Sequence, residues 1–185
     1  MAFDIITKDE EQKLFNVKKS KIWNLAYTIM LYTGIRVGEL CQLQMKDLYM
    51  ENIPLTRLTI RPEIAKTKIG RIVPIGDCLQ QMLIDYKIEL YERKSCDLND
   101  YLFRNKKTGK HLSSRQVQKQ LAKHSLAAFG RKIHPHSLRH TFATRLCAIT
   151  NIRVVQELLG HKSLQSTQVY THPNSIDMDN AIKKL

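Results

Sequence analysis

The segment from Ile22 to Tyr32 places the strongest constraint on how this chain can fold. Its residues, IWNLAYTIMLY, are apolar almost all the way round a helical wheel. A helix of this kind is buried, because every face of it has to be covered by other elements. Gly34 follows and is a natural helix stop. The sequence therefore predicts a central helix around which the rest of the chain packs.

The pattern changes between Leu55 and Ile75, where apolar and polar residues alternate in short runs. Alternation of this kind predicts a small antiparallel sheet. Pro62 and Pro74 are expected at strand edges, because proline cannot donate to a strand ladder. The KTKIG segment, residues 66–70, is expected at a turn or a strand end.

The remaining segments predict further helices. Thr7 suits the N-cap of a helix with an acidic first turn, and Asp77 is expected to cap an amphipathic helix. Ser113 or Ser114 can cap a helix that Gly130 ends. One further helix is expected to place Leu138, Phe142 and Leu146 against the core. Two more helices are expected, one over residues 164–170 and one over Ile176–Leu185. The predicted fold class is mainly α with a small antiparallel β-sheet, in a single domain over residues 1–185.

Charge and composition narrow the class of partner. Lys and Arg number 30 against 17 Asp and Glu, which gives a formal charge of +13. This excess favours a polyanion, with nucleic acid first and an anionic membrane second. The most apolar stretch is too short and too polar to span a bilayer, so the membrane alternative falls away. There is no secretory signal, and the four cysteines are far apart without a C-x-x-C pair, so a cytoplasmic location is expected.

The residues best suited to chemistry lie between positions 134 and 172. His136 and Arg139 are three residues apart at the start of an expected helix, so both project from one face. His161 follows a glycine at an expected helix end, and Tyr170 comes nine residues later. An arginine and two histidines close to a tyrosine hydroxyl would be suited to a nucleophilic attack by that hydroxyl on a phosphate.

Cleaving a phosphodiester without a metal requires four functions. A tyrosine is a suitable nucleophile when the bond is to be resealed, because a phosphotyrosine ester conserves the energy of the broken bond. Arginine suits the non-bridging oxygens, because its planar fork can hold two of them and never loses its charge. Histidine and lysine suit the two proton transfers.

Four motifs give the chain a specific resemblance. They are TGIRVGEL at Thr33–Leu40, HSLRH at His136–His140, LGH at Leu159–His161 and STQVYTH at Ser166–His172. In their order and spacing they resemble the catalytic domain of the tyrosine recombinases, also called the phage integrase family. The resemblance runs from about Thr7 to the C-terminus and implies a tyrosine recombinase catalytic-domain-like fold.

The resemblance implies a role for each matched residue. Arg36 is expected to be the first catalytic arginine and Arg139 the second, together clamping the scissile phosphate. His136 is expected to act as general base or to orient the phosphate, and His161 to hydrogen-bond it. Tyr170 is expected to form the 3′-phosphotyrosyl link to DNA.

The family also places a catalytic lysine on a small β-hairpin, as general acid for the leaving 5′-oxygen. Lys66 is the first choice, because it lies eight residues before Pro74 in a segment similar to the family's K-x-x-x-x-R-x-x-P. Lys68 is the alternative, because loop lengths vary in this region. Glu39 and His140 match supporting positions that orient the arginine and the phosphate-binding helix.

The implied protein is a site-specific recombinase that uses no metal, ATP or external cofactor and is encoded by a bacterium or a phage. Its expected partners are double-stranded DNA, further copies of the chain in a tetramer on two DNA sites, and accessory DNA-bending proteins. The segment from Ile176 to Leu185 would dock on a neighbouring protomer. The family's N-terminal core-binding domain is not in this chain. The chain is therefore expected to be either a fragment or one of the single-domain members, such as the fimbrial phase-switch invertases.

Several of these residues also have an ordinary structural interpretation. Arg36 can simply form an ion pair with Glu39, as many helical arginines do. His134, His136 and His140 are spaced so that two of them share a helix face, which suits zinc, but no nearby cysteine or acidic residue completes a ligand set.

Two other functions compete with recombination. One is a DNA-binding module without catalysis, which the complete set of expected catalytic residues argues against. The other is a type IB topoisomerase, which uses the same tyrosine chemistry but relaxes DNA as a monomer. The compact motif around Arg36 and the nine-residue gap from His161 to Tyr170 favour the recombinase.

Overall fold

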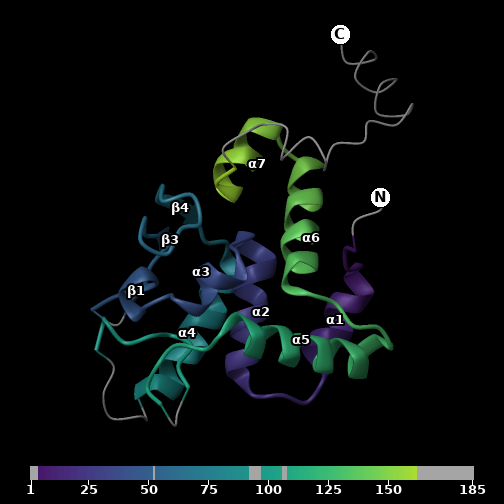
Figure 1. Ribbon diagram of the computed structural model, residues 1–185, viewed down its shortest axis with the longest axis horizontal. Coiled ribbons are helices and arrows are strands. Elements are labelled where there is room, and N and C mark those ends of the chain that lie inside the picture. Colours follow the sequence, from purple (N-terminus) through teal and green to yellow (C-terminus); the bar gives the residue numbers. More distant parts are fainter. Residues whose placement is uncertain (1–3, 52, 92–96, 106–107, 162–185) are drawn as a thin grey trace.

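The computed structural model describes residues 4–51, 53–91, 97–105 and 108–161 (Figure 1). At its centre lies α2 (Lys21–Thr33), in which eight of the thirteen residues are buried. Gly34 ends this helix in the left-handed conformation, with φ of 63°. The predicted buried central helix is therefore confirmed, together with its glycine stop.

Other helices cover α2 from several sides. It packs against α3, α4 and α6, while α1 packs against α5, and α7 lies against both α6 and β4 (Figure 1). The apolar wheel of α2 explains this arrangement, because each of its faces needs a partner. The bounds of these helices are Lys8–Asn16 (α1), Val37–Cys41 (α3), Asp77–Tyr91 (α4), Ser114–Phe129 (α5), Pro135–Cys147 (α6) and Ile152–Leu159 (α7), and a 3₁₀ turn covers Met45–Asp47.

The β-structure forms two small antiparallel sheets rather than one. The first pairs β1 (Tyr49–Met50) with β2 (Ile53–Pro54), and the second pairs β3 (Arg57–Ile60) with β4 (Arg71–Pro74). Residues in β3 are alternately exposed and buried, as a strand with one covered face requires. Residues 61–70 connect β3 to β4 and contain the KTKIG segment, as predicted. The predicted fold class, mainly α with a small antiparallel component, is confirmed.

The helix caps agree with the sequence at most positions. Thr7 caps α1 and accepts from the backbone of Glu10, and Ser113, rather than Ser114, caps α5. Asp77 is the first residue of α4 and not its cap. The predicted N-cap is therefore wrong by one position. The Asp77 carboxylate still lies in the first turn of α4, where the helix dipole favours it.

The core has a main part and a smaller one. Leu138 of α6 is fully buried in the main cluster around α2. Phe142 and Leu146 do not reach that cluster. They pack at the edge of a second one between α6 and α7, formed by Ala143, Val155 and Leu159.

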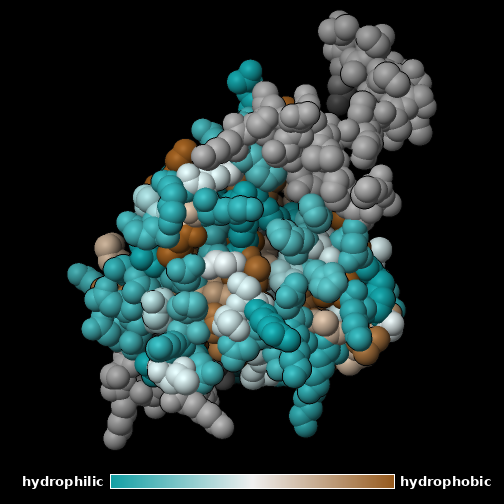
Figure 2. Space-filling view, in the orientation of Figure 1, coloured by the Kyte–Doolittle hydropathy of each residue, from teal (hydrophilic) through white to brown (hydrophobic). Residues whose placement is uncertain are grey.

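The surface is largely polar. Figure 2 shows one face of the molecule that is mostly hydrophilic, with hydrophobic residues in small separate patches. Among the described residues, no helix has the length and apolar character needed to cross a membrane. Cys41, Cys78 and Cys147 are free thiols.

Candidate functional site

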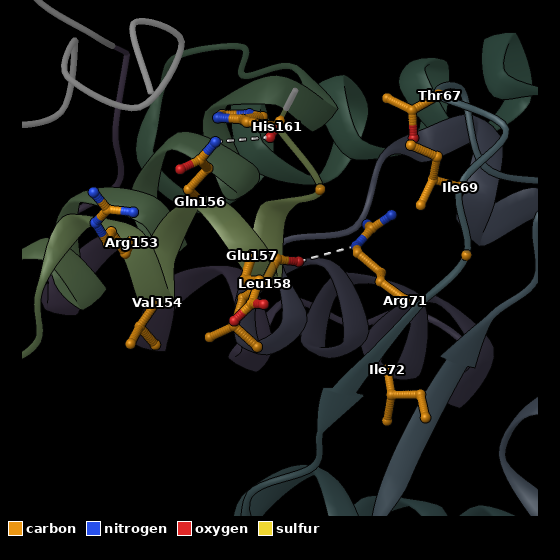
Figure 3. A pocket seen from close by; sticks show the side chains of 12 residues that line it. Thr67, Ile69, Arg71, Ile72, Arg153, Val154, Gln156, Glu157, Leu158 and His161 are labelled. Atoms are coloured by element: carbon orange, nitrogen blue, oxygen red, sulfur yellow. Dashed lines mark hydrogen bonds between the residues drawn. The ribbon is translucent and has the colours of Figure 1, made fainter. Parts of the chain in front are cut away.

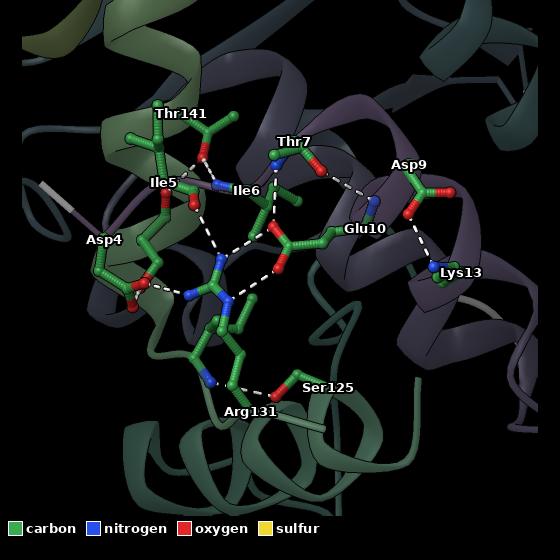
Figure 4. Close-up of polar contacts among 12 residues, drawn as sticks. Asp4, Ile5, Ile6, Thr7, Asp9, Glu10, Lys13, Ser125, Arg131 and Thr141 are labelled. Carbon is green, nitrogen blue, oxygen red and sulfur yellow. Dashed lines mark hydrogen bonds and ion pairs between the residues drawn. The ribbon is translucent and has the colours of Figure 1, made fainter. Parts of the chain in front are cut away.

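The N-terminal segment anchors the start of α6, the helix that carries three of the predicted site residues. Arg131 donates from Nε to Oε1 of Glu10 at 2.7 Å and from Nη2 to Oε2 at 2.8 Å, and it also pairs with Asp4 (Figure 4). Asp4 accepts in turn from the hydroxyl of Ser137 in the first turn of α6, at 2.7 Å. These bonds fix the first turn of α6 relative to α1.

The first turn of α6 has the geometry that its sequence predicts. Pro135 occupies the first helical position, and His134 before it is extended, with φ of −112° and ψ of 160°. His136 and Arg139 follow one turn apart, but in different environments. His136 is exposed, whereas Arg139 is only 4% exposed.

The Arg139 guanidinium is held by two segments that are distant from it in sequence, one at the end of α2 and one at the end of α7. Nη1 donates to the carbonyl oxygen of Gly34 at the end of α2, and Nη2 donates to that of Leu159 at the end of α7, at 2.8 Å. Nη2 also lies 3.0 Å from Nε2 of His161. The C-terminal ends of two helices therefore face this buried cation, and their partial negative charge compensates it.

Gly34 is required for this arrangement. Its φ of 63° is in the left-handed region, and a Cβ built there would collide with the ring of Phe142 and lie 2.9 Å from Cδ2 of Leu159. A side chain at this position would be strained and would also push α6 and α7 away from the end of α2. The absent side chain allows the Gly34 carbonyl to face Arg139.

Arg36 caps α3 and lies beside Glu39, whose carboxylate is 1% exposed. The Arg36 backbone N–H donates to Oε2 of Glu39 at 2.8 Å, and its Nη1 donates to Oε1 at 3.3 Å. Arg71 of β4 forms a stronger fork to the same carboxylate, at 2.9 and 2.7 Å. Burial alone would raise the pKa of Glu39, but the bonds from Arg71 and Arg36 lower it, so the group stays charged.

The sequence did not predict a role for Arg71, which is the main site residue that it missed. The arginine in the K-x-x-x-x-R-x-x-P segment was the one available signal. The simple interpretation of Arg36 as the ion-pair partner of Glu39 is only partly right. Among the described residues, the other donors of the Arg36 guanidinium have no hydrogen-bond partner.

The two candidate lysines are both exposed but differ in position. Lys68 has a positive φ of 58°, and its ammonium lies 3.5 Å from the carbonyl oxygen of Glu63 in the same loop. Lys66 is among the charges that lower the pKa of His136. The choice between Lys66 and Lys68 stays a prediction.

His161 follows the end of α7, where Gly160 is in the left-handed conformation as the helix cap. Burial, and then the charges of Arg139, Arg36 and Arg71, lower the pKa of His161 to about 4. Because Arg139 can only donate, Nε2 of His161 must accept, and the neutral ring carries its proton on Nδ1. His161 is therefore an uncharged hydrogen-bonding group near pH 7.

Helix α6 carries two further histidines, His136 and His140, and desolvation, together with the charge of Arg139, lowers the pKa of both. Their ring centroids are 6.2 Å apart. Desolvation lowers the pKa of His136, and the charges of Arg139, Arg36 and Lys66 lower it further. Desolvation also lowers the pKa of His140, followed by its neighbours on α6. Arg36 and Arg139 thus act on both His136 and His161, and Lys66 acts on His136.

Some predictions concern residues outside the described part of the chain. Tyr170, the expected nucleophile, is one of them, and so are the expected helices over residues 164–170 and Ile176–Leu185. Among the described residues, no group of three or more His, Cys, Asp or Glu side chains could hold a metal ion.

A groove of about 780 Å³ runs between the β3–β4 hairpin and α7 (Figure 3). Arg71, Gly160 and His161 lie on its inner side, and Ile72 and Val154 contribute apolar surface. Arg71 and His161 connect the groove to the other candidate residues, because Arg71 shares the Glu39 carboxylate with Arg36 and His161 contacts Arg139.

Sequence comparisons show which known proteins this chain is similar to. The profile of the phage integrase family matches residues 4–176. The chain is 36% identical over 184 residues to tyrosine recombinase XerA of Pyrococcus furiosus, which covers 97% of this chain and 60% of the relative. It is also 36% identical over 177 residues to tyrosine recombinase XerD of Oceanobacillus iheyensis, covering 91% and 57%. The chain therefore spans about three fifths of the length of these curated relatives.

Solved structures have the same fold. The crystal structure of XerA recombinase matches with a TM-score of 0.76 at 29% identity, covering 97% of this chain and 64% of the other. XerH site-specific recombinase bound to its difH substrate before cleavage matches with a TM-score of 0.73 at 27% identity, covering 97% and 53%. These likenesses confirm the predicted tyrosine recombinase fold.

Proposed function

The chain belongs to the phage integrase family, and on that premise we propose that residues 1–185 form the catalytic domain of a site-specific DNA recombinase. It cleaves and rejoins DNA strands through a 3′-phosphotyrosyl intermediate at Tyr170, so that DNA is integrated, excised or inverted. The observation that carries the proposal is the convergence of Arg36 and Arg139 on both His136 and His161, with Nη2 of Arg139 3.0 Å from Nε2 of His161, while Lys66 is among the charges that act on His136.

In the cleavage step, the Tyr170 oxygen attacks the scissile phosphorus in line and the bond to the 5′-oxygen breaks. Arg36 and Arg139 neutralise the non-bridging oxygens as charge develops on them, and a donor of this kind is typically worth about 10²–10³ in rate. Lys66 gives a proton to the departing 5′-oxygen. Religation is the reverse reaction with the 5′-hydroxyl of another strand.

The histidines have different roles in the proposed step. The lowered pKa of His136 keeps its ring neutral near pH 7, so it can accept the proton of the tyrosine. His161 is neutral and hydrogen-bonds the phosphate. Glu39 orients Arg36, and His140 supports the phosphate-binding turn of α6. These groups supply every charge and proton of the proposed step, so it needs no metal ion, ATP or cofactor.

The proposed partner is double-stranded DNA, because a formal charge of +13 attracts the chain to the phosphate backbone. Four protomers would assemble on two DNA sites, each docking its segment from Ile176 to Leu185 on a neighbour, with accessory DNA-bending proteins as helpers. The XerH relative was solved on its difH substrate, which supports DNA as the partner class.

A covalent-adduct assay tests the proposal. Nicked DNA duplexes carrying candidate sites are incubated with the wild type or with Tyr170→Phe and then denatured. The wild type should leave a protein–DNA adduct and Tyr170→Phe none. No adduct on any duplex would favour a non-catalytic binding module, whereas an adduct on arbitrary plasmid, with relaxation and no recombinants, would favour a topoisomerase.

A second variant tests the phosphate clamp. Arg139→Ala should abolish cleavage while leaving DNA affinity within a few-fold, because most affinity comes from contacts along the DNA backbone. Normal cleavage by Arg139→Ala would show that the clamp is misassigned.

A further inference from the structure

We propose that Arg71 is a positioning residue of this site. It holds the Glu39 carboxylate, and so prevents that carboxylate from taking Arg36 away from the phosphate. It also fixes the turn that carries His161. This inference rests on the proposed function and assigns Arg71 a role in the same reaction.

The Arg71 guanidinium joins three elements. From β4, Nη1 and Nη2 donate to the two oxygens of Glu39 on α3, and Nε donates to the carbonyl oxygen of Leu158 on α7 at 3.0 Å (Figure 3). The Arg71 side chain is 8% exposed. A buried fork with three directed bonds fixes its partners more firmly than a surface ion pair does.

The end of α7 is held by two arginines on successive carbonyls. Arg71 binds the oxygen of Leu158, and Arg139 binds that of Leu159. Carbonyls in the last turn of a helix have no partner within the helix, so these two bonds determine where the helix ends in space. A Cβ on Gly160 would lie 3.1–3.3 Å from Arg71 atoms, so the turn before His161 packs directly on this guanidinium.

The distances around Glu39 indicate a competition. Arg71 takes both carboxylate oxygens at 2.9 and 2.7 Å, and the Arg36 guanidinium keeps a single bond at 3.3 Å. Without Arg71, the buried carboxylate would need another cation, and Arg36 is its neighbour. A full fork between Arg36 and Glu39 would use the donors that the phosphate needs.

Lysine cannot replace Arg71 in this role. A single ammonium can reach one or two acceptors, but it has no planar fork for the carboxylate and no Nε donor for Leu158. Arg71→Lys therefore keeps the charge and removes the geometry. Arg61→Lys is a matched control, because Arg61 beyond β3 pairs with buried Asp47 at 2.8 Å and lies outside the proposed catalytic set.

The test measures the single-turnover rate of adduct formation on a nicked duplex, the affinity for intact duplex, and stability in urea. Arg71→Lys should lose about 10²-fold in rate, because small misplacements at a reacting centre have effects of that size. Its DNA affinity should stay within a few-fold of the wild type. Arg61→Lys should lose stability but keep the rate within a few-fold. Equal rate losses in the two variants would overturn the proposal.

A second substrate separates positioning from general loosening of the fold. In a scissile methylphosphonate, a neutral methyl group replaces one charged oxygen, so the reaction depends less on a correctly placed Arg36. The deficit of Arg71→Lys should shrink to a few-fold on this substrate. An unchanged deficit would refute the role of Arg71 through Arg36. If the wild type forms no adduct, the proposed function fails, and this inference fails with it.

Discussion

Replacing Gly34 with alanine should destabilise the fold by about 3 kcal/mol, the sum of two terms. The left-handed φ of 63° is unfavourable for any residue with a Cβ, by about 1 kcal/mol. The added Cβ would also collide with Phe142 and crowd Leu159, and overpacking of this kind typically costs about 2 kcal/mol. Small domains are stable by about 5–15 kcal/mol, so the loss should be easy to measure.

Gly130→Ala is the matched control for this experiment. Gly130 also ends a helix in the left-handed conformation, with φ of 78°, but a Cβ there meets nothing within 4 Å. It should lose only the conformational term, about 1 kcal/mol. Urea unfolding at equilibrium gives both free energies of unfolding, and the difference of about 2 kcal/mol isolates the collision.

The same pair of variants tests the link to the site. The Gly34 carbonyl accepts from Arg139, so Gly34→Ala should slow adduct formation even in buffer where the protein is folded. Gly130→Ala should react at the wild-type rate. Equal losses of stability in the two variants would refute the packing argument, and normal cleavage by Gly34→Ala would refute the functional one.

Three further predictions follow from described contacts. His161 has a folded pKa of about 4 against an ordinary 6.5, so the unfolded state takes up its proton first and stability falls as pH drops from 6.5 to 4, by up to about 3 kcal/mol. His161→Gln should have a shallower pH dependence in urea unfolding, and an unchanged slope would contradict this. Lys66→Ala should cleave about 10²-fold more slowly, and a substrate with a 5′-thiol leaving group, which needs no general acid, should restore the rate. Lys68→Ala should cleave almost normally, and the reverse result would exchange the two lysines. Arg131→Gln should lower stability by about 1 kcal/mol or more, whereas Lys13→Gln, which breaks an exposed pair with Asp9, should leave the urea midpoint almost unchanged.

Local sequence patterns were sufficient to predict most of the described helices and the strand pair β3–β4. The apolar wheel from Ile22 to Tyr32 predicted a buried helix, because burial on all sides follows directly from composition. The cap at Thr7, a serine cap at residue 113 or 114, and the stop at Gly130 were also predictable, because capping depends on neighbouring residues. The short β1–β2 pair, which lies before Leu55, was not predicted, because two-residue strands are too short to show an alternating pattern.

The site was predictable as a set of residues but not as a set of contacts. Motif order identified Arg36 and Arg139, yet nothing in the sequence shows that Arg139 would bind the carbonyls of Gly34 and Leu159. Those bonds exist only after α2, α6 and α7 have packed. Arg71 was missed for the same reason, since the K-x-x-x-x-R-x-x-P segment marks its position but not its contacts with Glu39 and Leu158. The role of Tyr170 stays a prediction.

The anchoring of residues 4–11 onto α6 has a consequence for engineering. Asp4 accepts from Ser137, one residue from His136, so force applied at the N-terminus would reach the helix that carries the proposed phosphate-binding groups. A purification tag or reporter domain joined rigidly ahead of Asp4 would pull on that helix. A Gly/Ser spacer of ten residues, with a root-mean-square span of about 18 Å, would release the tension.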